Sequence, residues 1–228
     1  MDITPLHSWD VSTAQAREIQ QQLRNRVSLH SPADWRKIRC IAAADVSFNR
    51  HGKFLYGAVV LFSFPELKLQ DVFLKKSEAG FPYVPGYLSF REAPVVLDMF
   101  ASMKQKPELL LCDGQGIAHP RGLGLASHLG LFLDMPSVGC AKSLLVGDYR
   151  EPGLQKGNKS VLFLKERQVG YVLRTRSGVK PVFISPGHKI SPEDAVEIAF
   201  ACSPRYRIPE PLRVAHQKVN DFRRMDGG

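Results

Sequence analysis

The order of the apolar segments along the chain constrains its fold more than any other feature. Residues 40–48, 56–64 and 69–76 are apolar runs separated by short turn signals, which predicts three consecutive strands in an antiparallel meander. Helices and strands then alternate, at 94–103, 108–114, 122–134 and 136–141. Because such alternation favours parallel crossovers, we predict an α/β fold with a mixed central β-sheet flanked by helices.

The remaining segments extend this pattern to both ends of the chain. Helical spacing of apolar residues predicts a helix over 12–27, capped by Ser12 or Thr13, and a last helix over 209–223. Three further elements are predicted as a hairpin at 160–175, a strand at 181–185 and a helix at 191–202 with Ser191 as its cap. At 228 residues, we expect 1–228 to form a single domain.

The charge and the cysteine content indicate what kind of partner and which cellular compartment to expect for this protein. The formal net charge is +9, and residues 150–228 contribute most of it, with 15 Lys and Arg against 8 Asp and Glu. An excess of this kind suits a polyanionic partner such as nucleic acid. The four cysteines, at 40, 112, 140 and 202, form no C-x-x-C pair and are expected to be reduced and buried, which indicates a cytoplasmic protein without a structural zinc site. No export signal and no membrane span are expected.

Two aspartates occupy positions that should be buried. Asp45 interrupts the run I-A-A-A-D-V-S-F, and Asp113 closes E-L-L-L-C-D. A buried carboxylate loses its hydration at a cost of several kcal/mol unless a cation or hydrogen bonds replace the water. Each alone could be a strand-end residue that caps a loop. Together, and with another carboxylate nearby, they are the hard oxygen ligands that Mg²⁺ requires.

Glu92 and His216 are further candidates with structural alternatives. Glu92 ends S-F-R-E, which matches a capping box with Ser89 as cap, but Pro94 would then lie inside the helix. With Pro94 in the first helical position instead, Glu92 would precede the helix with a free carboxylate. His216 falls on the apolar stripe of the last helix and is predicted to face inward, as a core histidine or as a ligand.

Taken together and in order, seven stretches closely resemble the endonuclease V family, the deoxyinosine-specific DNA repair nucleases. They are A-A-D-V-S-F (43–48), P-Y-V-P-G-Y-L-S-F-R-E (82–92), D-G-Q-G-I-A-H-P-R (113–121), G-L-A-S-H-L-G (124–130), V-G-C-A-K-S (138–143), P-V-F-I-S-P-G-H (181–188) and R-I-P-E-P-L-R-V-A-H (207–216). The resemblance implies a ribonuclease H-like fold, which agrees with the strand order read from the apolar runs.

The resemblance also implies a set of catalytic residues. Asp45, Glu92 and Asp113 would be the metal-binding carboxylates, with His216 completing the site, although some family members have Asp at this last place. Lys142 and His119 would lie near the scissile phosphate, where a lysine can stabilise charge and a histidine can hydrogen-bond the phosphate or the attacking water. The implied cofactor is Mg²⁺, with Mn²⁺ able to substitute, and hydrolysis then needs no covalent intermediate.

Base recognition is implied for two further groups of residues. Pro82, Tyr83, Val84 and Pro85 resemble the strand-separating wedge of the family, and two prolines restrict the backbone around Tyr83 so that little entropy remains to be lost. An inward-packed Tyr83 in a rigid surface turn is the structural alternative. The hypoxanthine pocket would comprise Gly86, Leu88, Gly114, Gly116, Gly124 and Leu145, although a packed helix–strand junction would also require glycines.

The implied activity is a Mg²⁺-dependent cut at the second phosphodiester bond 3′ to deoxyinosine, leaving 3′-hydroxyl and 5′-phosphate ends. The expected partner is double- or single-stranded DNA containing deoxyinosine, and the protein is expected to be a monomer. Two alternatives are an inosine-specific ribonuclease and a non-catalytic binder of damaged DNA. A RuvC- or transposase-like nuclease would share the carboxylates but not the P-Y-V-P element.

Overall fold

The central element is one mixed sheet. The structure, a computed structural model, describes residues 3, 5–49 and 52–227. Within these residues nine strands pair in the order β3-β2-β1-β4-β5-β9-β8-β7-β6. Their bounds are β1 Cys40–Phe48, β2 Phe54–Ser63, β3 Leu69–Glu78, β4 Leu109–Asp113, β5 Ser137–Ala141, β6 Asp148–Tyr149, β7 Lys159–Leu164, β8 Arg167–Leu173 and β9 Val182–His188.

The pairing directions match the predicted chain order. β1, β2 and β3 form the antiparallel meander, whereas β4 lies parallel to β1, and β5 lies parallel to β4. β9 then runs antiparallel to β5 and continues into the β8–β7 hairpin. Parallel neighbours run toward the same edge of the sheet, so the residues just after the paired segment of β1 and β4 lie side by side there.

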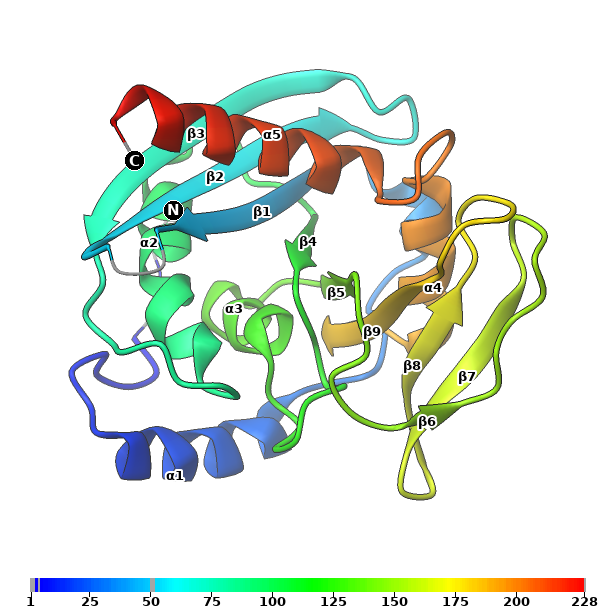
Figure 1. The fold of residues 1–228 in the computed structure, drawn as a ribbon, viewed down its shortest axis with the longest axis horizontal. Helices are drawn as coiled ribbons and strands as arrows, with labels where there is room; N and C mark the ends of the chain where they lie inside the picture. The colour runs from blue at the N-terminus through cyan, green and yellow to red at the C-terminus, as the bar shows by residue number, and fades with distance from the viewer. Residues whose placement is uncertain (1–2, 4, 50–51, 228) are drawn as a thin grey trace.

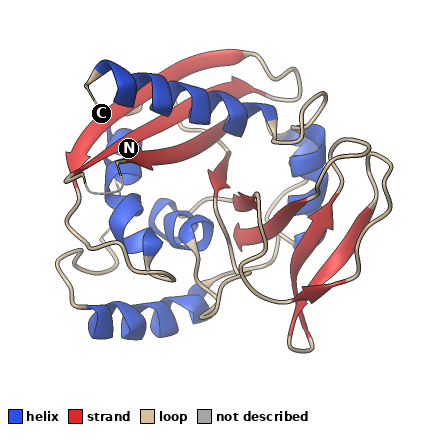
Figure 2. Cartoon of the chain, viewed as in Figure 1, coloured by secondary structure: helices blue, strands red, loops and turns tan. Residues whose placement is uncertain are grey.

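Helices cover both faces of this sheet, as Figures 1 and 2 show. Their bounds are α1 Thr13–Leu23, α2 Leu88–Ser102, α3 Leu125–Leu133, α4 Pro192–Ala201 and α5 Glu210–Met225. In β1, Ala42 and Ala44 contact the core under α2 and α3, while Ile41 and Ala43 contact the core under α4 and α5. This alternation follows from the two-residue period of a strand. The prediction of a mixed sheet flanked by helices is confirmed.

The predicted helix starts are confirmed at two places. Ser12 caps α1 through a capping box with Gln15, and Ser191 caps α4, with Pro192 in its first turn. α1 ends at Leu23, earlier than predicted, because residues 24–26 form a tighter 3₁₀ turn. The short strand β6 was not predicted.

The predicted start of the helix near residue 94 is wrong. α2 begins at Leu88, so Pro94 lies inside the helix and Glu92 belongs to it. The capping-box alternative is wrong as well, since Tyr87 is the N-terminal flanking residue and makes no side-chain cap. A proline inside a helix costs about 3 kcal/mol through the lost hydrogen bond. Burial of Phe90 and Phe100 on either side of Pro94 offsets this cost.

The four cysteines are buried and free, as predicted. No helix among the described residues is long and apolar enough to span a bilayer.

Candidate metal centre and adjoining cavity

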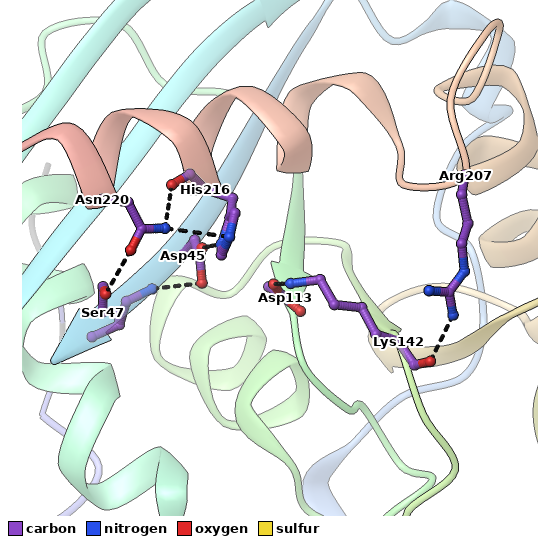
Figure 3. A network of polar contacts seen from close by, with 8 residues as sticks. Asp45, Ser47, Asp113, Lys142, Arg207, His216 and Asn220 are labelled. Atoms are coloured by element: carbon purple, nitrogen blue, oxygen red, sulfur yellow. Dashed lines mark hydrogen bonds and ion pairs between the residues drawn. The ribbon is translucent and has the colours of Figure 1, made fainter. Parts of the chain in front are cut away.

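Three potential metal ligands meet where the pairing of β1 with β4 ends. The strands pair in parallel up to Ala44 and Cys112, which places Asp45 beside Asp113. α5 crosses the same edge and adds His216, and one ligand atom from each of the three residues lies within 4.8 Å of the others. Figure 3 shows the three side chains converging from these separate elements.

His216 does not face inward as predicted. Its side chain is 55% exposed, and Nδ1 lies 2.7 Å from Oδ2 of Asp45. The buried stripe of α5 instead comprises Leu212, Ala215 and Val219, which places His216 at the edge of the helix, over the end of β1. The hydrogen bond to Asp45 raises the pKa of His216, because the carboxylate stabilises the imidazolium.

Glu92 approaches this group from α2. It is only 5% exposed, and its carboxylate is not one of the atoms that lie within 4.8 Å of one another. Burial raises the pKa of Glu92 well above its ordinary value, and the charges of Asp45 and Asp113 raise it further. The pKa of Asp113 is also raised, first by burial and then by Asp45.

Burial and the neighbouring carboxylates both disfavour the charged forms of Glu92 and Asp113, and a nearby positive charge would favour them. Lys142 donates to Oδ2 of Asp113 at 2.5 Å, and His216 is bound to Asp45. A divalent cation between the carboxylates would supply such a charge. Carboxylate oxygens with one imidazole are a donor set that Mg²⁺ or Mn²⁺ accepts, so the residues fit such an ion.

Arg207 positions Lys142 and was not predicted as a site residue. Its guanidinium donates to the carbonyls of Lys142, Lys180 and Pro181, at 2.7, 2.8 and 2.9 Å. Figure 3 shows the first of these contacts. These bonds hold the end of β5 against the segment that precedes β9. The R-I-P-E-P stretch carried this signal, but only the fold reveals which carbonyls Arg207 binds.

A cavity of about 220 Å³ lies beside the carboxylates. Its lining residues are Tyr83, Val84, Pro85, Gly86, Leu88, Ser89, Gly114, Gln115, His119, Gly124, Leu125 and Leu145. Five of the six predicted pocket residues line it, and Gly116 does not. Ser89, Gln115 and Leu125 were not predicted as pocket residues. The cavity is smaller than the ~300–1,000 Å³ of sites for drug-sized ligands and suits a single ring system.

Two predicted pocket glycines are required for backbone packing. A Cβ on Gly116 would lie 2.0 Å from the carbonyl oxygen of Pro186, and a Cβ on Gly124 would lie 2.3 Å from that of Gln115. Neither contact leaves room for a side chain. The alternative of a packed junction therefore accounts for both glycines, while Gly124 also lines the cavity.

His119 lies in the cavity wall, outside the group of potential metal ligands. Burial, with a smaller contribution from Arg121, lowers its pKa to about 4. Nδ1 accepts from the backbone N–H of Arg121 at 3.2 Å. The imidazole is therefore neutral near pH 7, and it can form hydrogen bonds but adds no positive charge.

The loop that carries Tyr83 presents its ring to solvent. Tyr83 is 62% exposed, so the alternative of an inward-packed ring is wrong. The loop is anchored on one side by buried Phe81, whose carbonyl accepts from Arg91 at 2.7 Å. On the other side it ends at Gly86, whose φ of +80° favours glycine.

Arg121 clamps the end of this loop. Its guanidinium donates to the carbonyl oxygen of Gly86, stacks 4.1 Å over the ring of Tyr87 and donates to the side chain of Gln20 at 2.5 Å. Neither Arg121 nor Gln20 was predicted as a site residue. The H-P-R stretch contained the signal, but the contact joins segments far apart in the sequence.

Comparison with known proteins identifies a shared family. The family model for endonuclease V matches residues 21–217. Endonuclease V of Alkalilimnicola ehrlichii is 47% identical over 215 residues, covering 94% of each chain. The crystal structure of endonuclease V from Streptomyces avermitilis superposes with a TM-score of 0.91 at 36% identity, over 97% of each chain.

A second solved structure carries a nucleic acid. It is a variant of Ciona intestinalis endonuclease V in complex with a 23-mer DNA that contains an inosine followed by a ribo-adenosine. The TM-score is 0.82 at 28% identity, over 93% of this chain and 98% of that chain.

Proposed function

The chain belongs to the endonuclease V family, and on this premise we propose that it nicks DNA containing deoxyinosine in a Mg²⁺-dependent reaction. Its mixed sheet is the ribonuclease H-like fold of that family. The proposed cut is at the second phosphodiester bond 3′ to the lesion and leaves 3′-hydroxyl and 5′-phosphate ends. The observation that supports this most is the convergence of Asp45, Asp113 and His216 within 4.8 Å, next to a cavity for one base.

The proposed metal ligands are Asp45, Asp113, Glu92 and His216, with Mg²⁺ as the ion and Mn²⁺ able to substitute. A bound divalent ion supplies Lewis-acid chemistry, which lowers the pKa of water and offsets charge on phosphoryl oxygens. Asp45 and Asp113 provide carboxylate oxygens, and their neighbours keep those oxygens in place. Val46 donates its backbone N–H to Oδ1 of Asp45 at 2.9 Å.

Lys142 and His119 are the proposed phosphate-side residues. The ammonium of Lys142 lies 2.5 Å from Oδ2 of Asp113, so it can oppose charge that develops on the phosphoryl oxygens beside that carboxylate. His119, as a neutral imidazole, can only orient the phosphate or the attacking water by a hydrogen bond. Its position in the cavity wall supports a contact on the base side of the scissile bond.

Pro82, Tyr83, Val84 and Pro85 are proposed to separate the strands. A base inside a duplex cannot be inspected, so it must leave the stack, which costs a few kcal/mol. An exposed Tyr83 on an anchored loop can fill the gap at little entropic cost. The extruded hypoxanthine would then occupy the 220 Å³ cavity behind the loop.

We further propose that the protein acts as a cytoplasmic monomer folded as one domain. The basic excess in residues 150–228 supports a polyanionic partner.

The test is a cleavage assay with labelled oligonucleotides in Mg²⁺, Mn²⁺ or EDTA. A deoxyinosine duplex, the matching adenine duplex and an inosine-containing single-stranded RNA are compared side by side. We expect a single nick in the deoxyinosine strand only, with a 3′-hydroxyl end, and none in EDTA. Preferred cutting of the RNA would make the protein a ribonuclease, and tight binding without a nick would make it a damaged-DNA binder.

A further inference from the structure

A chain of three hydrogen-bonded side chains connects the N-terminal segment to the base cavity. Nδ1 of His7 lies 2.7 Å from the carbonyl oxygen of Ser8, and Nε2 of His7 lies 2.7 Å from Nε2 of His128. Nδ1 of His128 lies 3.0 Å from Oγ of Ser89, which lines the cavity. His7 lies outside residues 21–217, the part of the chain that matches the family model.

The geometry of these hydrogen bonds determines which ring nitrogens of His7 and His128 carry a hydrogen and where the hydroxyl hydrogen of Ser89 points. A carbonyl oxygen only accepts, so Nδ1 of His7 must carry a hydrogen. In a neutral imidazole the other nitrogen then has none, and Nε2 of His7 accepts from Nε2 of His128. By the same rule Nδ1 of His128 is an acceptor. The hydroxyl of Ser89 therefore donates its hydrogen to His128.

The surroundings keep both imidazoles neutral. The ring of His7 packs against Trp9, Phe90 and Phe132, with centroids 4.5, 5.4 and 5.2 Å away. His128 is fully buried. Burial lowers the pKa of His7, and it lowers the pKa of His128 well below its ordinary value.

The consequence appears in the cavity. Because its hydrogen is committed to His128, the oxygen of Ser89 can only accept from a ligand. Ser89 is also the second residue of α2, and helix-start N–H groups have no intrahelical acceptor. One residue thus offers an acceptor and a donor side by side.

Two other polar groups of the cavity wall already form hydrogen bonds within the protein. The side-chain amide of Gln115 donates to the carbonyl of Ser143 at 3.4 Å, and its oxygen accepts from Ser185 at 3.4 Å. The carbonyl oxygen of Gly86 accepts from Gln20 at 3.0 Å and from Arg121. These groups shape the cavity, whereas Ser89 keeps free hydrogen-bonding capacity.

We propose that Ser89 is a specificity-determining residue that recognises the lactam edge of a 6-oxopurine, and that His128 and His7 are positioning residues that make it an acceptor. This inference rests on the proposed function and deepens it. Hypoxanthine presents an oxygen at C6 and an N1–H donor, which match the N–H and Oγ of Ser89. Adenine presents an amino group and a bare N1, so both pairings fail. Guanine shares the lactam edge, so its exclusion is left to the shape of the cavity.

The first test reads the protons directly and needs no activity. Long-range ¹H–¹⁵N spectra of histidine-labelled protein distinguish the two neutral tautomers. We expect hydrogen on Nδ1 in His7 and on Nε2 in His128. Hydrogen on Nδ1 of His128 would overturn the inference, because Ser89 would then accept from His128 and donate to the ligand.

The second test measures discrimination between bases. Affinities for deoxyinosine and adenine oligonucleotides are measured by fluorescence anisotropy without divalent ions, and their ratio is compared among variants. We expect Ser89→Ala to lower the ratio about 10- to 100-fold, as for one buried hydrogen bond left unmade. His7→Phe, which keeps an aromatic ring at that position, should lower it less and give mixed His128 tautomers.

The matched control is Ser127→Ala. Ser127 precedes His128 in α3 and is buried, but its hydroxyl has no hydrogen-bond partner within residues 3, 5–49 and 52–227. We expect its ratio to equal that of the wild type. If Ser89→Ala still binds deoxyinosine and its affinity ratio is unchanged, the inference about Ser89 is overturned and the proposed function still stands. If the wild type fails to bind deoxyinosine, the proposed function is overturned. The tautomers of His7 and His128 can still be measured in that case.

Discussion

The carboxylate group and the adjoining cavity lie side by side, yet they are built in opposite ways. Asp45, Asp113 and Glu92 are like charges held close together, and burial and mutual repulsion raise the pKa of Glu92 and of Asp113. The cavity is lined mostly by backbone and apolar atoms, and many of its polar groups are already hydrogen-bonded. In the proposed function the first region requires a cation, whereas the second is preformed. Substitutions should therefore affect the two regions differently.

The largest effect is expected in the carboxylate group. Asp113→Ala should lower the rate of nicking at least ~1,000-fold, about 4 kcal/mol, because a metal ligand is lost. Binding of deoxyinosine DNA should persist, since the cavity does not depend on that charge. Cleavage and gel-shift assays measure the two quantities. Asp98→Ala is the control, because Asp98 pairs with Lys75 on the surface. Ordinary nicking by Asp113→Ala in Mg²⁺ would rule out the metal assignment.

Among substitutions in the cavity wall, the largest effect on stability and binding is expected where a side chain would collide with the backbone. Gly124→Ala would bring a Cβ within 2.3 Å of the carbonyl oxygen of Gln115, so the loop must move. We expect a loss of ~1–3 kcal/mol in the free energy of unfolding, as for overpacking, together with weaker lesion binding. Denaturant unfolding and anisotropy measure these effects. Gly80→Ala is the control, since a Cβ there would have no atom of the described residues within 4 Å. Equal stability of both variants would contradict the packing argument.

Tyr83→Ala should weaken lesion binding about tenfold, because one aromatic–base contact is worth ~1–3 kcal/mol. The free energy of unfolding should not change, since the ring is 62% exposed. A gel-shift titration and a thermal melt test the two statements. Leu154→Ala, at a similarly exposed position, is the control. Unchanged affinity of Tyr83→Ala for the lesion would show that Tyr83 does not contribute to DNA binding.

The smallest effect concerns stability without metal. Glu92 has a raised pKa in the folded protein, so the folded state holds its proton more tightly than the unfolded state does. Stability should therefore fall as the pH rises above about 4.5, the ordinary value for Glu, until the folded pKa is passed. Glu92→Gln removes this charge and should melt a few degrees above the wild type at pH 8, with the difference vanishing toward pH 4.

Thermal melts in EDTA across this pH range measure the difference, and Glu66→Gln, on an exposed turn, is the control. Added Mn²⁺ should shrink the difference by stabilising the wild type. Parallel pH profiles for Glu92→Gln and the wild type would show that the carboxylate group carries no excess repulsion.

Much of the fold could be predicted because strand and helix periodicities are local. The bounds of β1 match the run from Cys40 to Phe48, and the caps at Ser12 and Ser191 were visible in the residues themselves. Pro94 shows the limit of this reasoning. Its local preference for a helix start lost to the burial of Phe90 and Phe100 around it.

The site divides in the same way. Asp45 and Asp113 could be selected because a carboxylate in an apolar run needs compensation, whatever the fold. The apolar periodicity of α5 predicted that His216 faces inward, which is wrong. Periodicity identifies the apolar face of a helix, but it does not show which residues at the edge of that face contact another element. Gly116 was expected to approach a base, and only the fold shows that it approaches Pro186.

Local patterns were enough to predict the antiparallel meander, the mixed sheet and the stiffened loop around Tyr83, and to select Asp45 and Asp113, since each depends on neighbouring residues. Packing of distant segments joins His7, His128 and Ser89 in one hydrogen-bonded chain and brings Arg121 onto Gly86, which no local pattern shows. The physical reason is that hydrogen bonds between distant segments depend on distances of a few tenths of an ångström, which packing of the whole chain sets.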